Sequence, residues 1–289
     1  MAIDIDVFEN VGADLLRRAS ITLPLDVKKA LEDAYERETS ETGKLELKNI
    51  LENFASANIL GKPMCQDTGL ISFFIRSRGI PDFKEVEAAL TRATIKATEN
   101  VPLRPNAVHP LTRKNLGNNV GWHIPNIIWL YEDVDYIQVT AFLKGAGSEN
   151  MSTLRILNPG EGVNGIKRFI VDSVVKAGGK PCPPTVLGIG IGGTVDLTSK
   201  LAKLALLRPM GFRNPDEAGA RLEDELLQLV NGTGVGPMGL GGDVTSLDVR
   251  IELAYCHIAS LPVALNMQCW ADRKAAAKVC PDGRVEHIM

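Results

Sequence analysis

Three of the five cysteines lie where an apolar segment meets a turn: Cys65 in KPMCQDTG, Cys182 in KPCPPTV and Cys269 in NMQCWADR. Thiolates are the usual protein ligands of iron–sulfur clusters, and ligands far apart in the sequence need only meet in space. Three thiolates would leave one iron of a cubane without a protein ligand, and an open metal position can act as a Lewis acid. No Cys-x-x-Cys pair supports this interpretation, and burial as a small apolar side chain is the alternative for each cysteine.

The other two cysteines fit burial or incidental exposure better. Cys256 lies inside the apolar run IELAYCHIASLP, and Cys280 lies in the C-terminal tail. An odd number of cysteines scattered over the chain does not suit the disulfide framework of a small secreted domain.

The composition is that of an ordinary globular protein. The chain has 289 residues, of which 45% are hydrophobic and 23% charged, and a formal net charge of −3. That charge gives no general attraction to nucleic acid or anionic membrane. No stretch approaches about 18 uninterrupted apolar residues, and the N-terminus lacks the basic and then apolar plan of a secretory signal. We therefore expect a cytoplasmic protein with a small-molecule ligand.

Helices and strands are indicated in about equal measure. Apolar residues at helical spacing predict helices over 25–38, 40–58, 81–100, 163–179 and 214–232. Strands are predicted within 70–79, 126–133 and 135–144, in the segment around VLGIGI, and in the apolar runs after residue 243. The expected fold class is mixed α/β, with helices packed around β-sheet and the strand order unknown. Without an internal repeat or an obvious linker, residues 1–289 are interpreted as one domain with a helical N-terminal part.

A polar loop over residues 101–121 separates two of these elements. Loops of that length inside compact domains are uncommon and are often functional. This loop contains Arg104, Asn106, His109, Arg113, Lys114 and Asn115, which would suit an anionic ligand. A solvated surface loop is the alternative.

Gly188, Gly190 and Gly193 formally match the dinucleotide fingerprint, because they follow a predicted strand and precede a predicted helix. No acidic residue closes a second strand about twenty residues later, as that fingerprint requires. Close packing of a helix on a strand explains the glycines better, and an NAD-dependent oxidoreductase stays a remote alternative.

Five segments, in one order, carry a family resemblance: MCQDTG, PLRPNAVHPLTRKNLGNN, KGAGSENMS, KPCPPTVLGIGIGGT and NMQCWADR. Together they resemble the iron–sulfur hydro-lyases of the class I fumarase and L(+)-tartrate dehydratase family. The resemblance covers nearly the whole chain and corresponds to the α part, whereas single-chain members continue into a second, β-type domain. It implies that the domain of residues 1–289 is catalytic, with a β subunit as partner, an α2β2 heterotetramer, and an active site at the subunit junction.

The resemblance also implies a cofactor and acid–base groups. Cys65, Cys182 and Cys269 would hold a 4Fe-4S cluster with one iron lacking a protein ligand. Asp67 would be an acid or base for the hydroxyl that leaves or arrives, and His257 would be its partner. The alternatives are that Asp67 only caps its turn and that His257 is a hydrogen-bonded core histidine.

Substrate binding is implied for Gln66, Arg104 and Gly147. A guanidinium suits a substrate carboxylate, so a small dicarboxylate is expected. The GSENMS segment resembles fumarases more than tartrate dehydratases, which favours interconversion of (S)-malate and fumarate, a tricarboxylic acid cycle reaction. L(+)-tartrate dehydration is the alternative, and a non-catalytic iron–sulfur scaffold is a remoter one. The base that takes the carbon-bound proton would lie on the β subunit.

Overall fold

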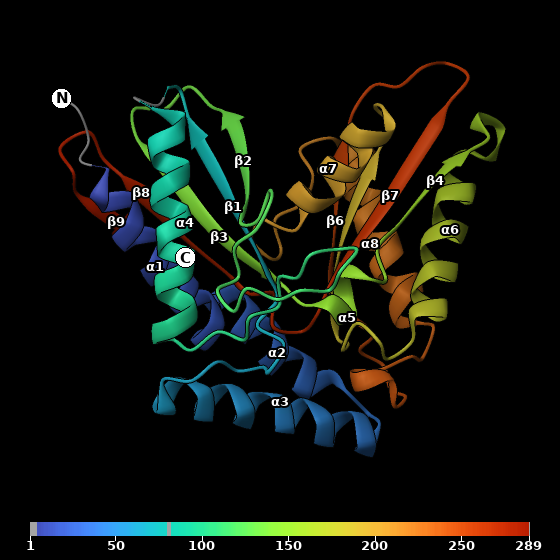
Figure 1. The fold of residues 1–289 in the computed structure, drawn as a ribbon. Helices are drawn as coiled ribbons and strands as arrows, with labels where there is room; N and C mark the ends of the chain where they lie inside the picture. Colours follow the sequence, from blue (N-terminus) through green and yellow to red (C-terminus); the bar gives the residue numbers. More distant parts are fainter. Residues whose placement is uncertain (1–4, 80–81, 289) are drawn as a thin grey trace. The chain divides into compact units, whose positions relative to one another are not determined.

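A computed structural model describes residues 5–79 and 82–288. The chain forms two compact units. Unit 1 comprises Met1–Leu25, Asn53–Ala146 and Arg273–Met289, and unit 2 comprises Asp26–Glu52 and Gly147–Asp272. Each unit is built around its own β-sheet with helices packed against it (Figure 1). This confirms the predicted mixed α/β class; the assignment of residues 1–289 to one catalytic domain stays a prediction.

The sheet of unit 1 has the strand order β2-β1-β3-β8-β9. Its strands are β1 (Leu70–Ser77), β2 (Asn126–Tyr131), β3 (Ile137–Lys144), β8 (Lys274–Val279) and β9 (Val285–His287). Strand β1 runs parallel to β2 and antiparallel to β3, and β3 pairs with β8. The C-terminal strands therefore join a sheet that begins two hundred residues earlier in the chain.

Helices α1 (Asp6–Ile21) and α4 (Phe83–Asn100) cover one face of this sheet. Both are amphipathic, and their apolar faces contribute to one buried cluster with the apolar side chains of β1, β3 and β8. Asp82 begins α4 by accepting hydrogen bonds from the amides of Lys84 and Glu85.

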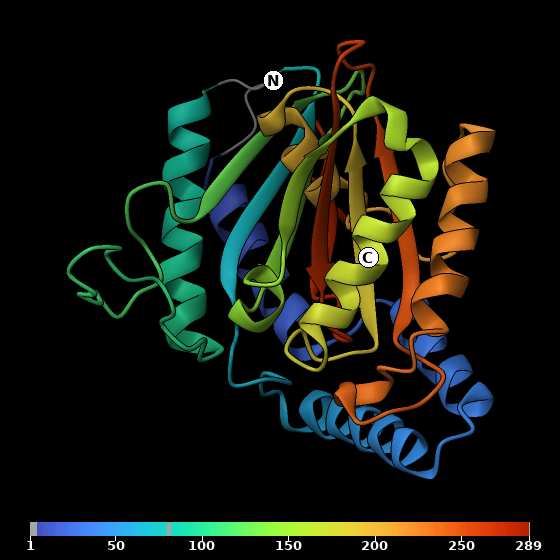
Figure 2. The same cartoon turned by 90° about the vertical axis from the view of Figure 1, so that its right-hand side faces the viewer.

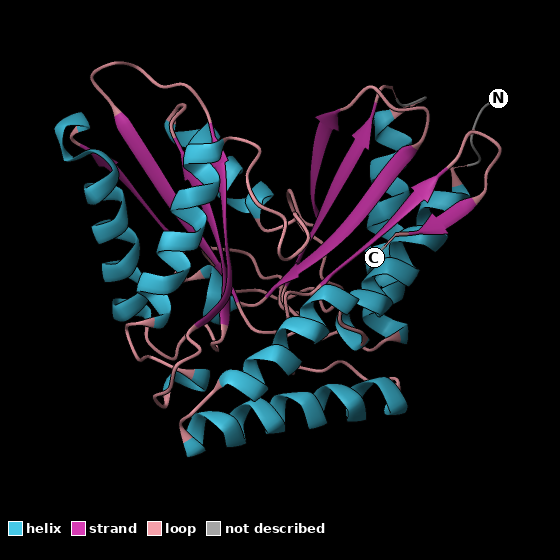
Figure 3. Ribbon diagram, turned by 180° about the vertical axis from the view of Figure 1, so that it is seen from behind, coloured by secondary structure: helices cyan, strands magenta, loops and turns pink. Residues whose placement is uncertain are grey.

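The sheet of unit 2 has the order β4-β7-β5-β6. Figures 2 and 3 show the ribbon from two further sides, with strands and helices distinguished by colour in Figure 3. Its strands are β4 (Thr153–Leu157), β5 (Thr185–Ile191), β6 (Ser246–Leu253) and β7 (Leu261–Gln268). Strand β5 is parallel to β6 and antiparallel to β7. Helices α6 (Gly162–Ala177) and α8 (Glu217–Asn231) pack against one face of the sheet, and α7 (Val195–Ala205) packs against the other.

Gly188 and Gly190 allow α7 to lie directly on β5. A β-carbon at Gly188 would collide with the Ala202 carbonyl oxygen, and one at Gly190 with the Thr198 carbonyl oxygen. The two glycines therefore have a packing explanation that needs no dinucleotide.

The remaining helices are α2 (Leu25–Arg37), α3 (Glu41–Leu60), the short α5 (Ala146–Glu149) and the 3-10 turns η1 (Pro159–Glu161) and η2 (Pro237–Gly239). Glu38 lies between α2 and α3, and its buried carboxylate accepts hydrogen bonds from the amides of Asp243 and Val244. Among the described residues, no helix is both long and apolar enough to cross a lipid bilayer.

Candidate active site

The turn over residues 61–69 connects α3 to β1 and carries Cys65. The Met64 amide donates to the Ser20 carbonyl at 3.0 Å, and the Asn53 side-chain amide donates to the Met64 carbonyl at 2.9 Å. These bonds anchor the chain immediately before Cys65 and Gln66, whose side chains are exposed. The thiol is thus held at the N-terminal end of β1 and remains accessible.

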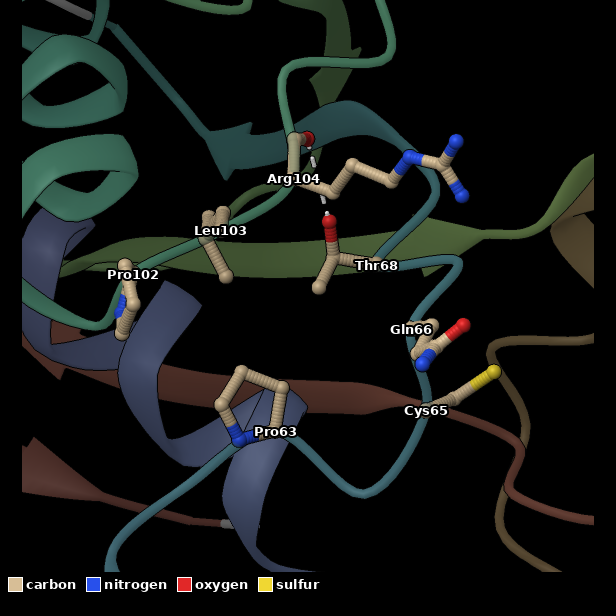
Figure 4. A pocket seen from close by; sticks show the side chains of 7 residues that line it. All are labelled: Pro63, Cys65, Gln66, Thr68, Pro102, Leu103 and Arg104. Atoms are coloured by element: carbon tan, nitrogen blue, oxygen red, sulfur yellow. Dashed lines mark hydrogen bonds between the residues drawn. The ribbon is translucent and has the colours of Figure 1, made fainter.

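A hollow of about 490 Å³ opens beside this turn. It is lined by Pro63, Cys65, Gln66, Thr68, Pro102, Leu103 and Arg104 (Figure 4). The sulfur of Cys65, the amide of Gln66 and the guanidinium of Arg104 point to the same side of the turn. Among the described residues, the side chains of Gln66 and Arg104 have no hydrogen-bond or ion-pair partner, so their donors are available to a ligand.

Asp67 is held by three hydrogen-bond donors. Its Oδ1 accepts from the Gly69 amide at 3.0 Å and from Asn106 Nδ2 at 3.2 Å, and its Oδ2 accepts from the Ala146 amide at 2.7 Å. The hydrogen bond from the Gly69 amide shows that Asp67 caps its turn, which is the alternative to an acid–base role. Asp67 therefore has a structural function, and its catalytic function stays a prediction.

Asn119 organises the long loop and was not singled out by the sequence analysis. Only 3% of its surface is exposed. Its Nδ2 donates to the carbonyl of Arg104 at 3.0 Å, and its Oδ1 accepts from the amide of Asn106 at 2.6 Å. Its φ of 59° lies in the left-handed region that asparagine tolerates. The Asn-Asn pair in the loop was the only signal for this role in the sequence.

Of the six polar loop residues predicted to suit an anion, Arg104 and Asn106 reach the Cys65 turn. Asn115 donates to the Pro105 carbonyl at 2.8 Å and supports the loop internally. His109 Nδ1 accepts from the amides of Leu111 and Thr112. The others, Arg113 and Lys114, are exposed and do not line the hollow.

Cys182 and Cys269 lie at the same end of the sheet of unit 2. Cys182 precedes β5 and Cys269 follows β7, and these strands are antiparallel neighbours. The amide of Trp270 donates to the carbonyl of Cys182 at 3.2 Å. Cys182 has a φ of 57°, a conformation that non-glycine residues rarely adopt outside functional or tight turns. The structure thus brings together the turns of two cysteines that are 87 positions apart in the sequence.

Gly147 has a packing role at the same end of unit 2. A β-carbon at Gly147 would lie 2.7 Å from the carbonyl oxygen of Lys180, two residues before Cys182. The glycine therefore lets α5 approach the Cys182 turn. Its contact with substrate stays a prediction.

His257 lies at the opposite end of this sheet, in the loop over residues 254–260 between β6 and β7. That loop is at the upper end of β7 in Figure 1, whereas Cys269 follows the lower end. Eight residues of extended backbone span roughly 25 Å. His257 is exposed, so it is not a core histidine, and it does not lie beside Cys182 or Cys269 of its own chain. Instead it lines a hollow of about 510 Å³ with Cys256 and the start of α7.

The three predicted ligands, Cys65, Cys182 and Cys269, are cysteine thiols, which is the chemistry that an iron–sulfur cluster requires. Cys182 and Cys269 lie on two adjacent turns of unit 2, and Cys65 is an exposed thiol on an anchored turn of unit 1. Among the described residues, no group of three or more histidine, cysteine, aspartate or glutamate side chains is arranged so that it could hold a metal ion. The assignment of Cys65, Cys182 and Cys269 as cluster ligands stays a prediction.

Comparison with known proteins gives the family. A model of the family "Fumarate hydratase (Fumerase)" matches residues 9–278. A protein of Methanocaldococcus jannaschii, provisionally named L(+)-tartrate dehydratase subunit alpha, is 50% identical over 281 residues, which cover 96% of this chain and 99% of the relative. The L(+)-tartrate dehydratase subunit alpha of Escherichia coli K12 is 32% identical over 280 residues, covering 96% and 92%.

The chain belongs to this family. It is a hydro-lyase of the class I fumarase and tartrate dehydratase type, a family that uses an iron–sulfur cluster. The matched residues include the Cys65 turn, the Arg104 loop and both cysteine turns of unit 2. Both relatives are named as alpha subunits, and an α subunit implies a further subunit.

Proposed function

We propose that this chain is the α subunit of a 4Fe-4S hydro-lyase that dehydrates L(+)-tartrate. The observation that supports this best is the hollow at the Cys65 turn. There an accessible thiol, a carboxamide and a guanidinium without an ion-pair partner among the described residues point to one side. Such a set offers a cluster ligand, a hydrogen-bond donor and a carboxylate clamp within one small site.

The choice of tartrate differs from the expectation of malate and fumarate, which rested on the GSENMS segment. In the structure this segment is engaged in packing: Gly147 accommodates the Lys180 carbonyl, and buried Ser148 donates to Gln268. Gly147 and Ser148 therefore have packing contacts that do not depend on which substrate is bound. The names of the relatives favour tartrate, and (S)-malate with fumarate is the second candidate.

Substrate binding falls to Arg104 and Gln66 in this proposal. The guanidinium of Arg104 can donate two parallel hydrogen bonds to a substrate carboxylate, and the Gln66 amide can donate a further one. Asn119 and Thr68 both bind the main-chain carbonyl of Arg104, which fixes the position from which its side chain extends. Gly147 would contribute only its backbone.

The cluster would be held by Cys65, Cys182 and Cys269, and its iron without a protein ligand would supply a Lewis acid that eases departure of the hydroxyl group. Asp67 is proposed to exchange a proton with that hydroxyl. Its three hydrogen-bond donors fix the carboxylate in one orientation, as an acid–base group requires. The base for the carbon-bound proton is assigned to the β subunit.

His257 is proposed to act at the site of a second α subunit in an α2β2 assembly. Within one chain it lies at the end of β7 opposite to Cys269. A catalytic role for His257 therefore requires its exposed loop to reach the cluster of another copy.

The test is anaerobic purification of the chain with and without a co-expressed β subunit, followed by reconstitution with iron and sulfide. L(+)-tartrate and (S)-malate are then assayed separately for oxaloacetate and fumarate. Oxaloacetate formation that needs both cluster and partner supports the proposal. Activity with malate alone would make the protein a fumarase subunit, and inactivity of the loaded complex with both substrates would favour the non-catalytic scaffold.

A further inference from the structure

Arg273 is a buried cation next to the Asp67 turn. Only 1% of its surface is exposed. Its Nη1 donates to the main-chain carbonyl of Asp67 at 2.7 Å, while its Nε has no hydrogen-bond partner among the described residues. The Arg273 guanidinium also forms no ion pair with any of the residues that the structure describes. Burying a guanidinium without a direct counter-ion is costly, so an apolar side chain of similar size would serve packing better.

Gly145 shows how close the charge of Arg273 comes to the Asp67 carboxylate. A β-carbon built on Gly145 would lie 2.9 Å from Asp67 Oδ2 and 3.3 Å from Arg273 Nη2. The two groups therefore flank the same point, and the absence of a side chain at residue 145 leaves room for both. The guanidinium places positive charge beside the carboxylate without occupying its oxygens.

Arg273 and the carboxylate of Asp67 are both hydrogen-bonded to main-chain amides at the C-terminal end of β3 and just beyond it. The Leu143 amide donates to the Arg273 carbonyl at 3.0 Å, and the Ala146 amide donates to Asp67 Oδ2 at 2.7 Å. Leu143 is the last residue but one of β3. Arg273 immediately precedes β8, the strand that pairs with β3. Asp67 is thus held at its main-chain carbonyl by Arg273 and at its carboxylate by the amide of Ala146.

We infer that Arg273 is a positioning residue for Asp67. It holds the Asp67 peptide through the main-chain carbonyl and lies beside the carboxylate, and Gly145 leaves the space for both groups. This inference rests on the proposed function, in which Asp67 exchanges a proton with the substrate hydroxyl. Nothing in the geometry requires Arg273 to touch substrate.

The experiment compares Arg273→Met and Arg273→Lys with the wild type in the reconstituted α–β complex. Arg273→Met should lower kcat per loaded cluster by about 100-fold with KM changed less than about 3-fold, a loss of the size expected for a misplaced acid–base group. Arg273→Lys, which keeps the charge, should recover part of the loss. Arg76→Met is the matched control, because Arg76 lies at the far end of β1 and is paired with Glu132.

A readout independent of turnover separates the two proposals. Arg273→Met should speed hydrogen exchange at the amides of Gly69 and Ala146, which donate to Asp67, and leave exchange at Gly192 unchanged. If Arg273→Met does not fold, Gly145→Ala should give the same kinetic and exchange changes. Wild-type kcat per cluster with wild-type exchange in these variants would overturn the inference. An inactive wild-type complex that still shows faster exchange in the variants would overturn only the proposed function.

Discussion

The main-chain carbonyl of Cys182 accepts a hydrogen bond from the amide of Trp270 at 3.2 Å. This bond joins the turn before β5 to the turn after β7 and places Cys182 beside Cys269. Two of the three proposed cluster ligands are therefore positioned by backbone that is already folded, so the metal would not need to create their arrangement.

Replacing any proposed cluster ligand should remove the cluster without unfolding the chain. We expect Cys65→Ser, Cys182→Ser and Cys269→Ser each to lower iron and sulfide content severalfold, because serine is a poor ligand for these irons. Iron and sulfide per chain and the charge-transfer absorbance measure the effect. Cys280→Ser is the control and should keep full loading, and loss of the cluster in that variant would contradict the ligand assignment.

Replacing Arg104 should weaken substrate binding more than it slows the reaction. Arg104→Met removes a charge-assisted clamp worth about 1.5–3 kcal/mol, so KM for tartrate should rise roughly 10- to 100-fold. Steady-state kinetics with the α–β complex measure this. Arg113→Met, on the same loop but outside the hollow, should leave KM unchanged, whereas an equal increase in both variants would point to a general charge effect of the loop.

Two inactive α subunits should complement each other if His257 acts on a neighbouring copy. His257→Ala and Cys65→Ser, which should lack the cluster, are co-expressed with different tags, and the doubly tagged assembly is isolated. With random pairing of two copies, about a quarter of wild-type site activity should return in the unselected mixture, because a mixed pair has one complete site. No recovery in the doubly tagged assembly would assign His257 a role within its own chain or none.

A side chain at position 190 should lower the stability of unit 2 and should have no effect on NAD binding, because we expect the wild type to bind no NAD. Gly190→Ala forces a β-carbon into the Thr198 carbonyl and should lower the free energy of unfolding by about 1–3 kcal/mol. Chemical denaturation measures the change, and titration with NAD should show no binding in either protein. Gly79→Ala, where no atom lies within 4 Å of the added carbon, is the control. Tight NAD binding by the wild type would revive the dinucleotide interpretation.

The Asp14 carboxylate in α1 should make stability depend on pH. Burial opposes its ionisation, but hydrogen bonds from Arg18 and Arg17 prevail and lower the pKa of Asp14 below its ordinary value of 3.8. A lowered folded-state pKa contributes stability above pH 3.8, and that contribution is lost as the pH falls through the folded-state value. Asp14→Asn should therefore cost up to about 1 kcal/mol at pH 7 and less at pH 3, measured by urea unfolding. An equal cost at both values would exclude this linkage.

The sequence by itself determined the family, the hydro-lyase class and most of the local structure. Helical spacing predicted α2 (Leu25–Arg37) and α4 (Phe83–Asn100) within two residues at their ends, because that spacing is a local property of the chain. The order of the five motifs indicated the family, which the comparisons confirm. The cluster ligand Cys65 and the dicarboxylate contacts Gln66 and Arg104, which that resemblance implies, stay predictions.

Strand order and the neighbours of each functional residue were decided only by the tertiary structure. Strands β2 and β3 follow each other in the chain, yet β1 lies between them, because pairing depends on long-range burial that no local pattern records. Twelve positions separate His257 from Cys269, and an extended strand turns that short separation into opposite ends of a sheet. By contrast, antiparallel pairing of β5 and β7 brings the turn of Cys182 next to the turn of Cys269. Antiparallel pairing of β3 and β8 likewise places Arg273 where it donates to the main-chain carbonyl of Asp67.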